Sequence, residues 1–172
     1  MLAIPTFSQS EDKNAPKIKW LTFTQAVEAN NKEPRKFFID VYTKWCGWCK
    51  VMDAKSFAHP VIVEYVNKKY YAVKLDAEMS DTVLFRGYTF VNPNPGVNRS
   101  AHQLAAALLN NQFGYPTTVY LDEKVDMLTG SPIPGFQPPK SLEIILKFYG
   151  ENHYQKTSFE EFKKTFVGEV KE

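Results

Sequence analysis

The sequence predicts a layered α/β fold, in which helices cover a sheet that contains parallel strands. Two observations carry this prediction. From residue 16 onward, segments with helical spacing alternate with short β-branched and aromatic runs, and 44% of the 172 residues are hydrophobic, enough for a packed core. Because the order helix, strand, helix, strand is typical of crossover units with parallel strands, we expect one domain of ordinary size with some added structure.

The first predicted elements are a helix and a buried strand. Thr22 or Thr24 can cap a helix over residues 24–29, which two asparagines and a proline then end. Residues 36–42 follow as a short β-branched and aromatic run, typical of a buried strand. One acid, Asp40, interrupts this run.

The next two elements repeat this order. We expect a helix after Trp45, which Pro60 ends or kinks before residues 61–66 resume helical spacing. Residues 70–75 then provide the second strand of the crossover unit.

The second half of the chain begins with its least regular part, residues 78–113. A run of asparagine, proline and glycine within it can only form a turn or loop, and Ser100 opens a predicted helix with a capping box that continues to residue 109. After it we expect a strand over 117–122, a turn and a fourth strand within 126–134, an amphipathic helix over 140–149 and a short last helix over 158–167.

Charge and cysteine counts exclude several classes of protein. The chain has 21 basic and 19 acidic residues, a net charge of +2, which gives no strong field for nucleic acid. No apolar stretch approaches the length needed for stable membrane insertion. Two cysteines are too few for a disulfide-dense scaffold or a four-cysteine zinc site. We expect a monomer that does not bind nucleic acid and is not stably inserted in a membrane.

The two cysteines form the one residue pattern in this sequence that points to a specific chemical mechanism. Cys46 and Cys49 are separated by two residues, directly after a predicted strand and at the start of a predicted helix. The free N–H groups and dipole of a helix N-terminus stabilise a thiolate, so Cys46 should have a lowered pKa and act as a nucleophile. Cys49 lies on the same helix face and can close a disulfide that releases a substrate bound to Cys46.

Two other interpretations of the cysteine pair are weaker. Half of a metal site would need further ligands, but the three histidines lack the paired spacing of a zinc ligand set. A purely structural disulfide would close a very short loop and would therefore stabilise the fold little. We expect no metal.

Three segments around these cysteines resemble the thioredoxin-like thiol–disulfide oxidoreductases. Residues 38–50 look like the family's strand and active-site segment, including an acid six positions before the first cysteine. Residues 73–76 resemble the strand that follows, and residues 114–118 resemble the loop whose proline is cis in the family. The resemblance covers roughly residues 18–150.

The resemblance implies a three-layer sandwich with a central mixed β-sheet flanked by helices. The connection between Asp76 and Pro116 is longer than in a minimal thioredoxin, so we expect a helical insertion over 78–113 before the cis-proline loop. It would either shape a partner groove or cover the sheet edge. A single domain would span 16–172 and include a C-terminal helical extension over 151–172. This enlargement resembles thioredoxin-like proteins of bacterial cell envelopes.

The resemblance also implies roles beneath the active site. Asp40 would be the buried acid that relays a proton to and from Cys49, and its burial in an apolar strand should raise its pKa. Lys74 matches the lysine beside that acid in the family. An ordinary surface lysine is the alternative.

Substrate-binding roles follow from the same resemblance. Pro116 would be cis, and the backbone of Tyr115 would lie close to the first cysteine, where it could pair with an extended substrate segment. Trp45, Gly47 and Trp48 would border the substrate. The Gly47-Trp48 dipeptide stands where ordinary thioredoxin has glycine and proline, so we expect a different redox potential.

The expected function is a thiol–disulfide oxidoreductase that acts on protein disulfides as a reductase. It needs no cofactor besides the redox-active Cys46–Cys49 pair, but it does need a redox partner protein to exchange electrons. Two alternatives stay open. One is a disulfide oxidase or isomerase with the same residues, and the other is a non-enzymatic binding module anchored by Trp45 and Trp48.

The start of the chain bears on its location. Residues 1–15 form either an N-terminal arm or the remnant of a secretory signal, because an apolar and then small or polar stretch precedes the charged run Glu11-Asp12-Lys13. Together with the resemblance, this favours the periplasm or cell envelope of a bacterium. The cytoplasm is the alternative.

Overall fold

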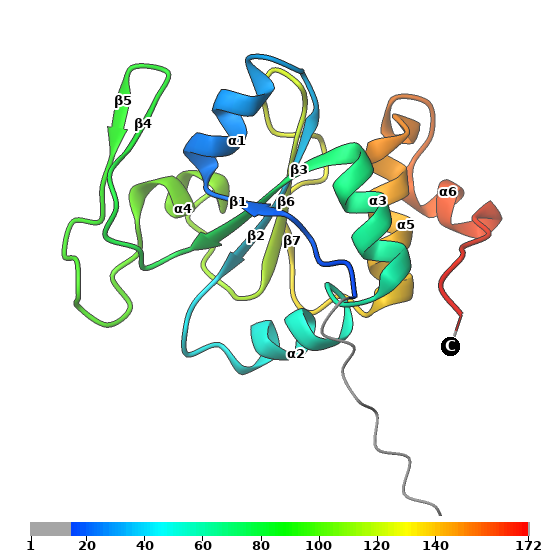
Figure 1. The fold of residues 1–172 in the computed structure, drawn as a ribbon, viewed down its shortest axis with the longest axis horizontal. Coiled ribbons are helices and arrows are strands. Elements are labelled where there is room, and N and C mark those ends of the chain that lie inside the picture. Colours follow the sequence, from blue (N-terminus) through cyan, green and yellow to red (C-terminus); the bar gives the residue numbers. More distant parts are fainter. Residues whose placement is uncertain (1–14, 172) are drawn as a thin grey trace, which may run out of the picture.

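A five-stranded mixed sheet forms the centre of the molecule (Figure 1). The computed structural model describes residues 15–171, so nearly all of the predicted N-terminal segment lies outside the described residues. Three neighbouring strands are parallel and the last two are antiparallel, which confirms the predicted fold class. The order across the sheet is β1 (Trp20–Leu21), β3 (Tyr70–Asp76), β2 (Lys36–Tyr42), β6 (Thr117–Leu121) and β7 (Ile133–Pro134).

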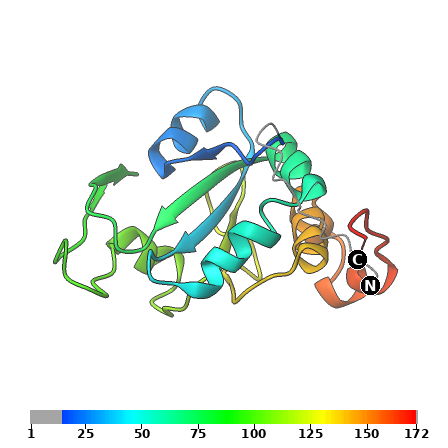
Figure 2. The ribbon, with the colours of Figure 1, turned by 60° about the horizontal axis from the view of Figure 1, so that its bottom comes forward.

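Helices cover both faces of this sheet (Figure 2). The helices α1 (Phe23–Asn30) and α4 (Gln103–Leu108) pack on one face. The opposite face is covered by α2 (Gly47–Lys55), α3 (Pro60–Lys69) and α5 (Pro139–Gly150).

The central strand β2 is an almost unbroken apolar run because both of its faces are buried. Phe37 and Ile39 belong to the core cluster beneath α1 and α4, whereas Phe38 belongs to the cluster beneath the other helices. Asp40 shares the face of Phe38, since alternate strand residues point the same way.

Local sequence signals account for the first helices. The side chain of Thr22 accepts a hydrogen bond from the backbone N–H of Gln25, and the Gln25 side chain accepts one from the Thr22 N–H. This reciprocal capping box fixes the start of α1. Pro60 occupies the first turn of α3, where its missing N–H is not needed, so it separates two helices instead of kinking one.

The segment between β3 and β6 differs in two ways from the predicted helical insertion. It contains a hairpin, β4 (Val83–Phe85) and β5 (Tyr88–Phe90), in addition to α4. The cap of α4 is also not Ser100, because His102 Nδ1 accepts the Leu104 N–H at 3.1 Å. The Ser100 hydroxyl instead donates to Asn92 Oδ1 at 2.6 Å, which removes it from the helix.

The C-terminal residues pack against α5. They form a 3₁₀ turn, His153–Gln155, and α6 (Phe159–Thr165), whose first turn is capped by Ser158. The rings of Phe159 and Phe162 in α6 pack on the ring of Phe148 in α5.

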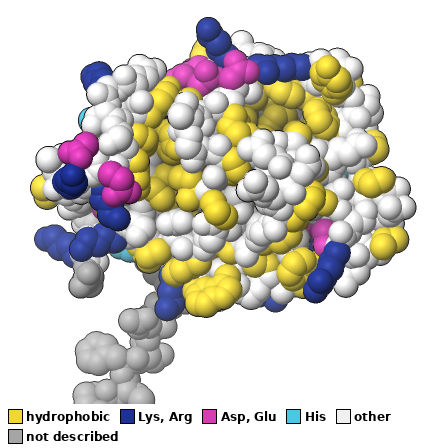
Figure 3. All heavy atoms as spheres, turned by 180° about the vertical axis from the view of Figure 1, so that it is seen from behind, with side chains coloured by type: hydrophobic (Ala, Val, Ile, Leu, Met, Phe, Trp, Pro, Cys, Tyr) yellow, Lys and Arg dark blue, Asp and Glu magenta, His cyan; other side chains and the backbone are white. Residues whose placement is uncertain are grey.

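The described surface carries charges of both signs. On the side turned away in Figure 1, acidic and basic side chains lie close together in small groups, with hydrophobic side chains exposed between them (Figure 3). This interleaving agrees with the small net charge of the chain. No helix within residues 15–171 combines the length and apolar character needed to cross a membrane.

Candidate active site

Cys46 stands at the N-terminus of α2, just beyond the end of the central strand. It is the N-cap residue of the helix, and its Sγ accepts a hydrogen bond from the backbone N–H of Cys49 at 3.1 Å. The two residues form a disulfide with a Cα–Cα distance of 5.3 Å. The helix therefore directs an N–H group and the positive end of its dipole at the sulfur of Cys46.

Exposed tryptophans border the two cysteines, which are themselves almost completely covered. Cys46 is 5% exposed and Cys49 is 2% exposed, whereas Trp45 and Trp48 are 50% and 62% exposed. Gly47 lies between them, and a Cβ atom at this position would have open space around it. We call Trp45 and Trp48, with the exposed Gly47 between them, the aromatic rim of the site.

Asp40 lies in the middle of β2 with a side chain that is 1% exposed. Its register partners are Lys74 on β3 and Thr118 on β6. Lys74 Nζ lies 2.6 Å from Asp40 Oδ2, while Oδ1 has no hydrogen-bond partner among the described residues. Burial raises the pKa of Asp40 to about 6, because loss of hydration outweighs the opposing effect of Lys74.

Lys74 joins Asp40 to helix α2. Its ammonium group also pairs with Asp53, which α2 carries one turn beyond Cys49. Three rings surround the ammonium group, with ring centres 4.9–5.1 Å away, those of Tyr42, Phe57 and Trp20. Burial disfavours the ammonium form, but the two carboxylates outweigh burial and raise the pKa of Lys74. Lys74 is 20% exposed and lies beside Asp40, the position that the resemblance implies.

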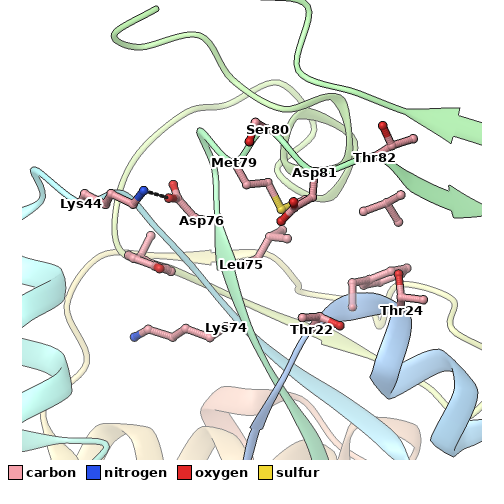
Figure 4. Close-up of a pocket in the computed structure, with 13 residues that line it drawn as sticks. Thr22, Thr24, Lys44, Lys74, Leu75, Asp76, Met79, Ser80, Asp81 and Thr82 are labelled. Carbon is pink, nitrogen blue, oxygen red and sulfur yellow. Dashed lines mark ion pairs between the residues drawn. The ribbon is translucent and has the colours of Figure 1, made fainter. Parts of the chain in front are cut away.

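A pocket of about 510 Å³ opens on the other side of Lys74 (Figure 4). It lies between the start of α1 and the residues that follow β3, and its lining includes Lys44 and Asp76, which form an ion pair at 3.6 Å. The cysteines do not line it. Lys74 therefore contributes both to the lining of this pocket and to the ion pair with buried Asp40.

The predicted proline loop lies against the active-site rim. The Tyr115–Pro116 peptide bond is cis, and the Pro116 carbonyl accepts the Gly135 N–H at 2.8 Å. The Tyr115 ring meets the Trp45 ring edge-on, with centres 5.8 Å apart. On the other side of the cysteines, Trp48 packs on Phe136 at 5.4 Å. The rim is therefore built from the β2–α2 turn and two loops distant in sequence.

Two groups at this site, Asp53 and Glu78, lay outside the sequence prediction. Glu78 Oε1 accepts the indole N–H of Trp45 at 3.0 Å, so the first residues of the insertion contact the active-site rim. Its position just after β3 is a signal that could have been used, since β2 and β3 are parallel and their carboxyl ends lie at the same edge. Asp53 gives no such signal, because its partner is set by the packing of α2.

The site offers sulfur chemistry and proton transfer. Two sulfurs can cycle between dithiol and disulfide, and a carboxyl with a pKa of about 6 can exchange protons near neutral pH. Within residues 15–171, no cluster of three or more histidine, cysteine or acidic side chains is placed to hold a metal ion.

Comparison with solved structures shows the fold. The chain superposes on the DsbH oxidoreductase with a TM-score of 0.56 and 13% identity, over 87% of this chain and 95% of that one. A putative disulphide-isomerase from Bacteroides thetaiotaomicron gives 0.55 and 19% identity, over 84% and 98%. A thioredoxin from Thermus thermophilus gives 0.55 and 14% identity, over 76% and 85%. The fold is therefore that of thioredoxin.

Sequence comparison identifies the family. No curated protein sequence matches the chain. Residues 8–148 match the family model Thioredox_DsbH, described as a protein of unknown function, DUF255. This match covers most of the chain, including the cysteine pair, the buried acid and the cis-proline loop. The chain belongs to the Thioredox_DsbH family of thioredoxin-like proteins.

Proposed function

We propose that this protein is a thiol–disulfide oxidoreductase that reduces disulfide bonds in other proteins. The observation that carries the proposal is the position of Cys46 as N-cap of α2, with its sulfur accepting the Cys49 N–H. After reduction, the same N–H group and the helix dipole stabilise a Cys46 thiolate, which is the nucleophilic form.

The reaction proceeds in two exchanges. The Cys46 thiolate attacks one sulfur of the substrate disulfide, forms a mixed disulfide and expels the other substrate sulfur as a thiolate, which takes up a proton. Cys49 then loses its proton and attacks the Cys46 sulfur, which releases the second substrate thiolate and closes the Cys46–Cys49 disulfide. Two electrons pass from the dithiol to the substrate, and a dithiol partner protein must return them. No bound cofactor takes part.

Asp40 serves the second exchange in this proposal as the acceptor of the Cys49 proton. Its partner Lys74 also pairs with Asp53 of α2, so the carboxyl faces the helix that carries Cys49. With a pKa of about 6, Asp40 is mostly ionised at pH 7 and can accept a proton. This supports turnover in the reducing direction.

A substrate contacts the aromatic rim in this proposal. Trp45, Gly47 and Trp48 border the cysteines on the α2 side, and Tyr115 and Pro116 border them from the proline loop. An extended segment of the substrate protein pairs with the backbone of Tyr115 in the manner of strand addition.

The direct test is reduction of a protein disulfide by the purified chain with a dithiol reductant present. We expect the wild-type protein to accelerate the reaction, whereas the reaction with Cys46→Ser should proceed at the uncatalysed rate. Equal rates for the two proteins would contradict the proposal and favour a binding module with passive cysteines. A reduction potential near about −120 mV, in place of one near about −270 mV, would favour a disulfide oxidase.

The partner can be captured with Cys49→Ser, which preserves the mixed disulfide at Cys46. We propose that the protein works as a monomer in the bacterial periplasm or cell envelope, in line with the resemblance to enlarged envelope thioredoxins. Fractionation of producing cells tests the location, and trapped complexes found in the cytoplasm would contradict it. Size-exclusion chromatography tests the monomeric state.

A further inference from the structure

The insertion places a positive charge over the active-site rim. The Glu78 oxygen that accepts the Trp45 indole N–H also accepts the backbone N–H of Arg99 at 2.9 Å. The guanidinium carbon of Arg99 lies 5.4 Å from the centre of the Trp45 ring. One carboxylate thus fixes both the tryptophan before Cys46 and the insertion residue that covers it.

The loop that carries Arg99 is closed at its base by a buried side chain. Asn92 is 6% exposed, and its amide donates to the carbonyl groups of Ser100 at 2.8 Å and Glu78 at 3.3 Å. Arg99 itself has φ 64°, a left-handed conformation that residues other than glycine rarely adopt. The surrounding hydrogen bonds therefore hold the Arg99 backbone in a specific place beside Trp45.

The guanidinium group of Arg99 is exposed and makes no ion pair in the described chain. Within residues 15–171 its guanidinium makes no ion pair and no hydrogen bond, and the Glu78 carboxylate is already engaged by two N–H groups. Lys50, directly after Cys49, is likewise exposed without an ion pair in the described chain. By contrast, Lys44 pairs with Asp76. Arg99 and Lys50 thus provide two positive charges without an ion pair near the cysteine pair, next to the one negative charge of Glu78.

We propose that Arg99 is a specificity-determining residue, which favours disulfide substrates that carry carboxylates beside the disulfide bond. A guanidinium donates directed hydrogen bonds to a carboxylate, and its charge attracts anions while it repels cations. Because the site is exposed, we expect a preference of about two- to fivefold. This inference rests on the proposed function, since it names the substrate class of the same site.

Three small disulfides of similar size test the charge preference. They are dithiodiglycolate, which is dianionic, hydroxyethyl disulfide, which is neutral, and cystamine, which is dicationic. Each is mixed in excess with the pre-reduced full chain, and the loss of the dithiol is followed by acid quench and mass spectrometry. For each protein, the second-order rate constant with the anionic disulfide is divided by that with the cationic disulfide. The intrinsic reactivities of the two disulfides cancel when this ratio is compared between variants.

We expect Arg99→Gln to lower this ratio by about two- to fivefold, and Arg99→Lys to keep most of it. The rate with the neutral disulfide should change little in both. Arg86→Gln is the control, because Arg86 also has positive φ, lies over a ring at 5.0 Å and belongs to the insertion, but stands at the tip of the β4–β5 hairpin, where it pairs with Asp126 at 2.8 Å. The wild-type ratio should also fall as salt is added.

The outcomes separate the two proposals. An unchanged ratio in an active Arg99→Gln protein, or an equal change in Arg86→Gln, would overturn the role of Arg99 and leave the oxidoreductase intact. If wild-type protein reacts no faster than Cys46→Ser with any of the three disulfides, the proposed function is wrong and this inference falls with it. Retention of the ratio by Arg99→Lys shows that charge, and not loss of loop structure, is responsible.

Discussion

The ammonium group of Lys74 lies 2.6 Å from Oδ2 of Asp40 and pairs at the same time with Asp53. One cation therefore bridges a carboxylate that is 1% exposed and another that is 47% exposed. The buried carboxylate depends on this cation much more than the exposed one, because water stabilises Asp53 directly.

Removing the cation should shift the pH dependence of catalysis. Lys74 lowers the pKa of Asp40, so Lys74→Met should raise that pKa from about 6 and move the acidic limb of the pH–rate profile upward. We expect the rate at pH 6.5 to fall more than the rate at pH 8.5. Reduction rates with hydroxyethyl disulfide across this range check it, with Lys55→Met at the exposed end of α2 as control. If the pH–rate profiles of wild type and Lys74→Met coincide, Lys74 does not set the pKa of Asp40 during catalysis.

The ionised side chain of Asp40 should lower the unfolding free energy of the protein at neutral pH. Its pKa is raised from 3.8 to about 6, so the unfolded chain ionises more readily and stability falls as pH rises from about 4 to about 6. The full penalty, at most about 3 kcal/mol, then persists at higher pH. Asp40→Asn should therefore be more stable than wild type at pH 8, by about 1–3 kcal/mol, and nearly equal to it at pH 4.

Urea unfolding of the disulfide forms at pH 4, 6 and 8 measures this difference. Glu64→Gln on the exposed face of α3 provides a control that should show no such trend. If the stability difference between Asp40→Asn and wild type does not depend on pH, then folding does not raise the pKa of Asp40.

His102 should make the insertion sensitive to acid. Its Nδ1 accepts the Leu104 N–H and its Nε2 lies 2.8 Å from the Asp81 carbonyl oxygen, so the ring is neutral with its proton on Nε2. Burial lowers the pKa of His102 below 6.5. Its contribution to stability is therefore complete above pH 6.5 and is lost as pH falls from there toward the lower folded pKa.

This trend has the opposite sign to that of Asp40, so a local measurement is needed. Amide hydrogen exchange, corrected for its intrinsic pH dependence, should show less protection in α4 at pH 5 than at pH 7. His102→Asn keeps a capping acceptor without a titrating ring and should remove the difference. Equal pH dependence in wild type and His102→Asn would rule out this role.

Glu143 should hold the C-terminal segment on α5. Its carboxylate is 1% exposed and accepts the backbone N–H groups of Glu169 at 2.7 Å and Val170 at 3.0 Å. Glu143→Ala leaves both donors without this partner, so we expect a loss of about 1–3 kcal/mol in unfolding free energy and faster proteolysis after residue 165. Glu160→Ala, exposed on α6, is the control. Unchanged proteolysis of Glu143→Ala would show that other contacts hold this segment.

The fold could be predicted where the sequence pattern was strong. The patterns of β2, β3 and β6 are clear because these strands have seven, seven and five residues, most of them β-branched or aromatic, and that of α1 because Thr22 and Gln25 form a capping box. β1 has only two residues and therefore carries no periodicity. The β4–β5 hairpin escapes prediction for a similar reason, since each of its strands has three residues and its exposed side chains break the alternation.

The candidate site was predictable where a motif marks it. Cys46, Cys49 and Asp40 fall within one short segment, and Lys74, Tyr115 and Pro116 came from the resemblance to thioredoxin-like proteins. The contacts made by the other charged groups of the site depend on how α2 and an irregular loop pack against the sheet, and no spacing in the sequence reports that packing.

The predicted cap at Ser100 shows how a local pattern can mislead. A hydroxyl followed by a glutamine three residues later fits the capping box, so the sequence favours a helix that begins there. Asn92 competes for this hydroxyl from eight residues earlier in the chain, and the helix begins after His102 instead.

The active-site rim draws its residues from separate stretches of the chain. The segment around β2 and α2 carries the cysteines, while Glu78 and Arg99 come from the connection between β3 and β6. Under the proposed function, exchange of residues 92–100 between relatives should keep the redox chemistry of the cysteine pair and change which disulfides react. Substrate preference could then diverge among relatives while the cysteine segment stays the same.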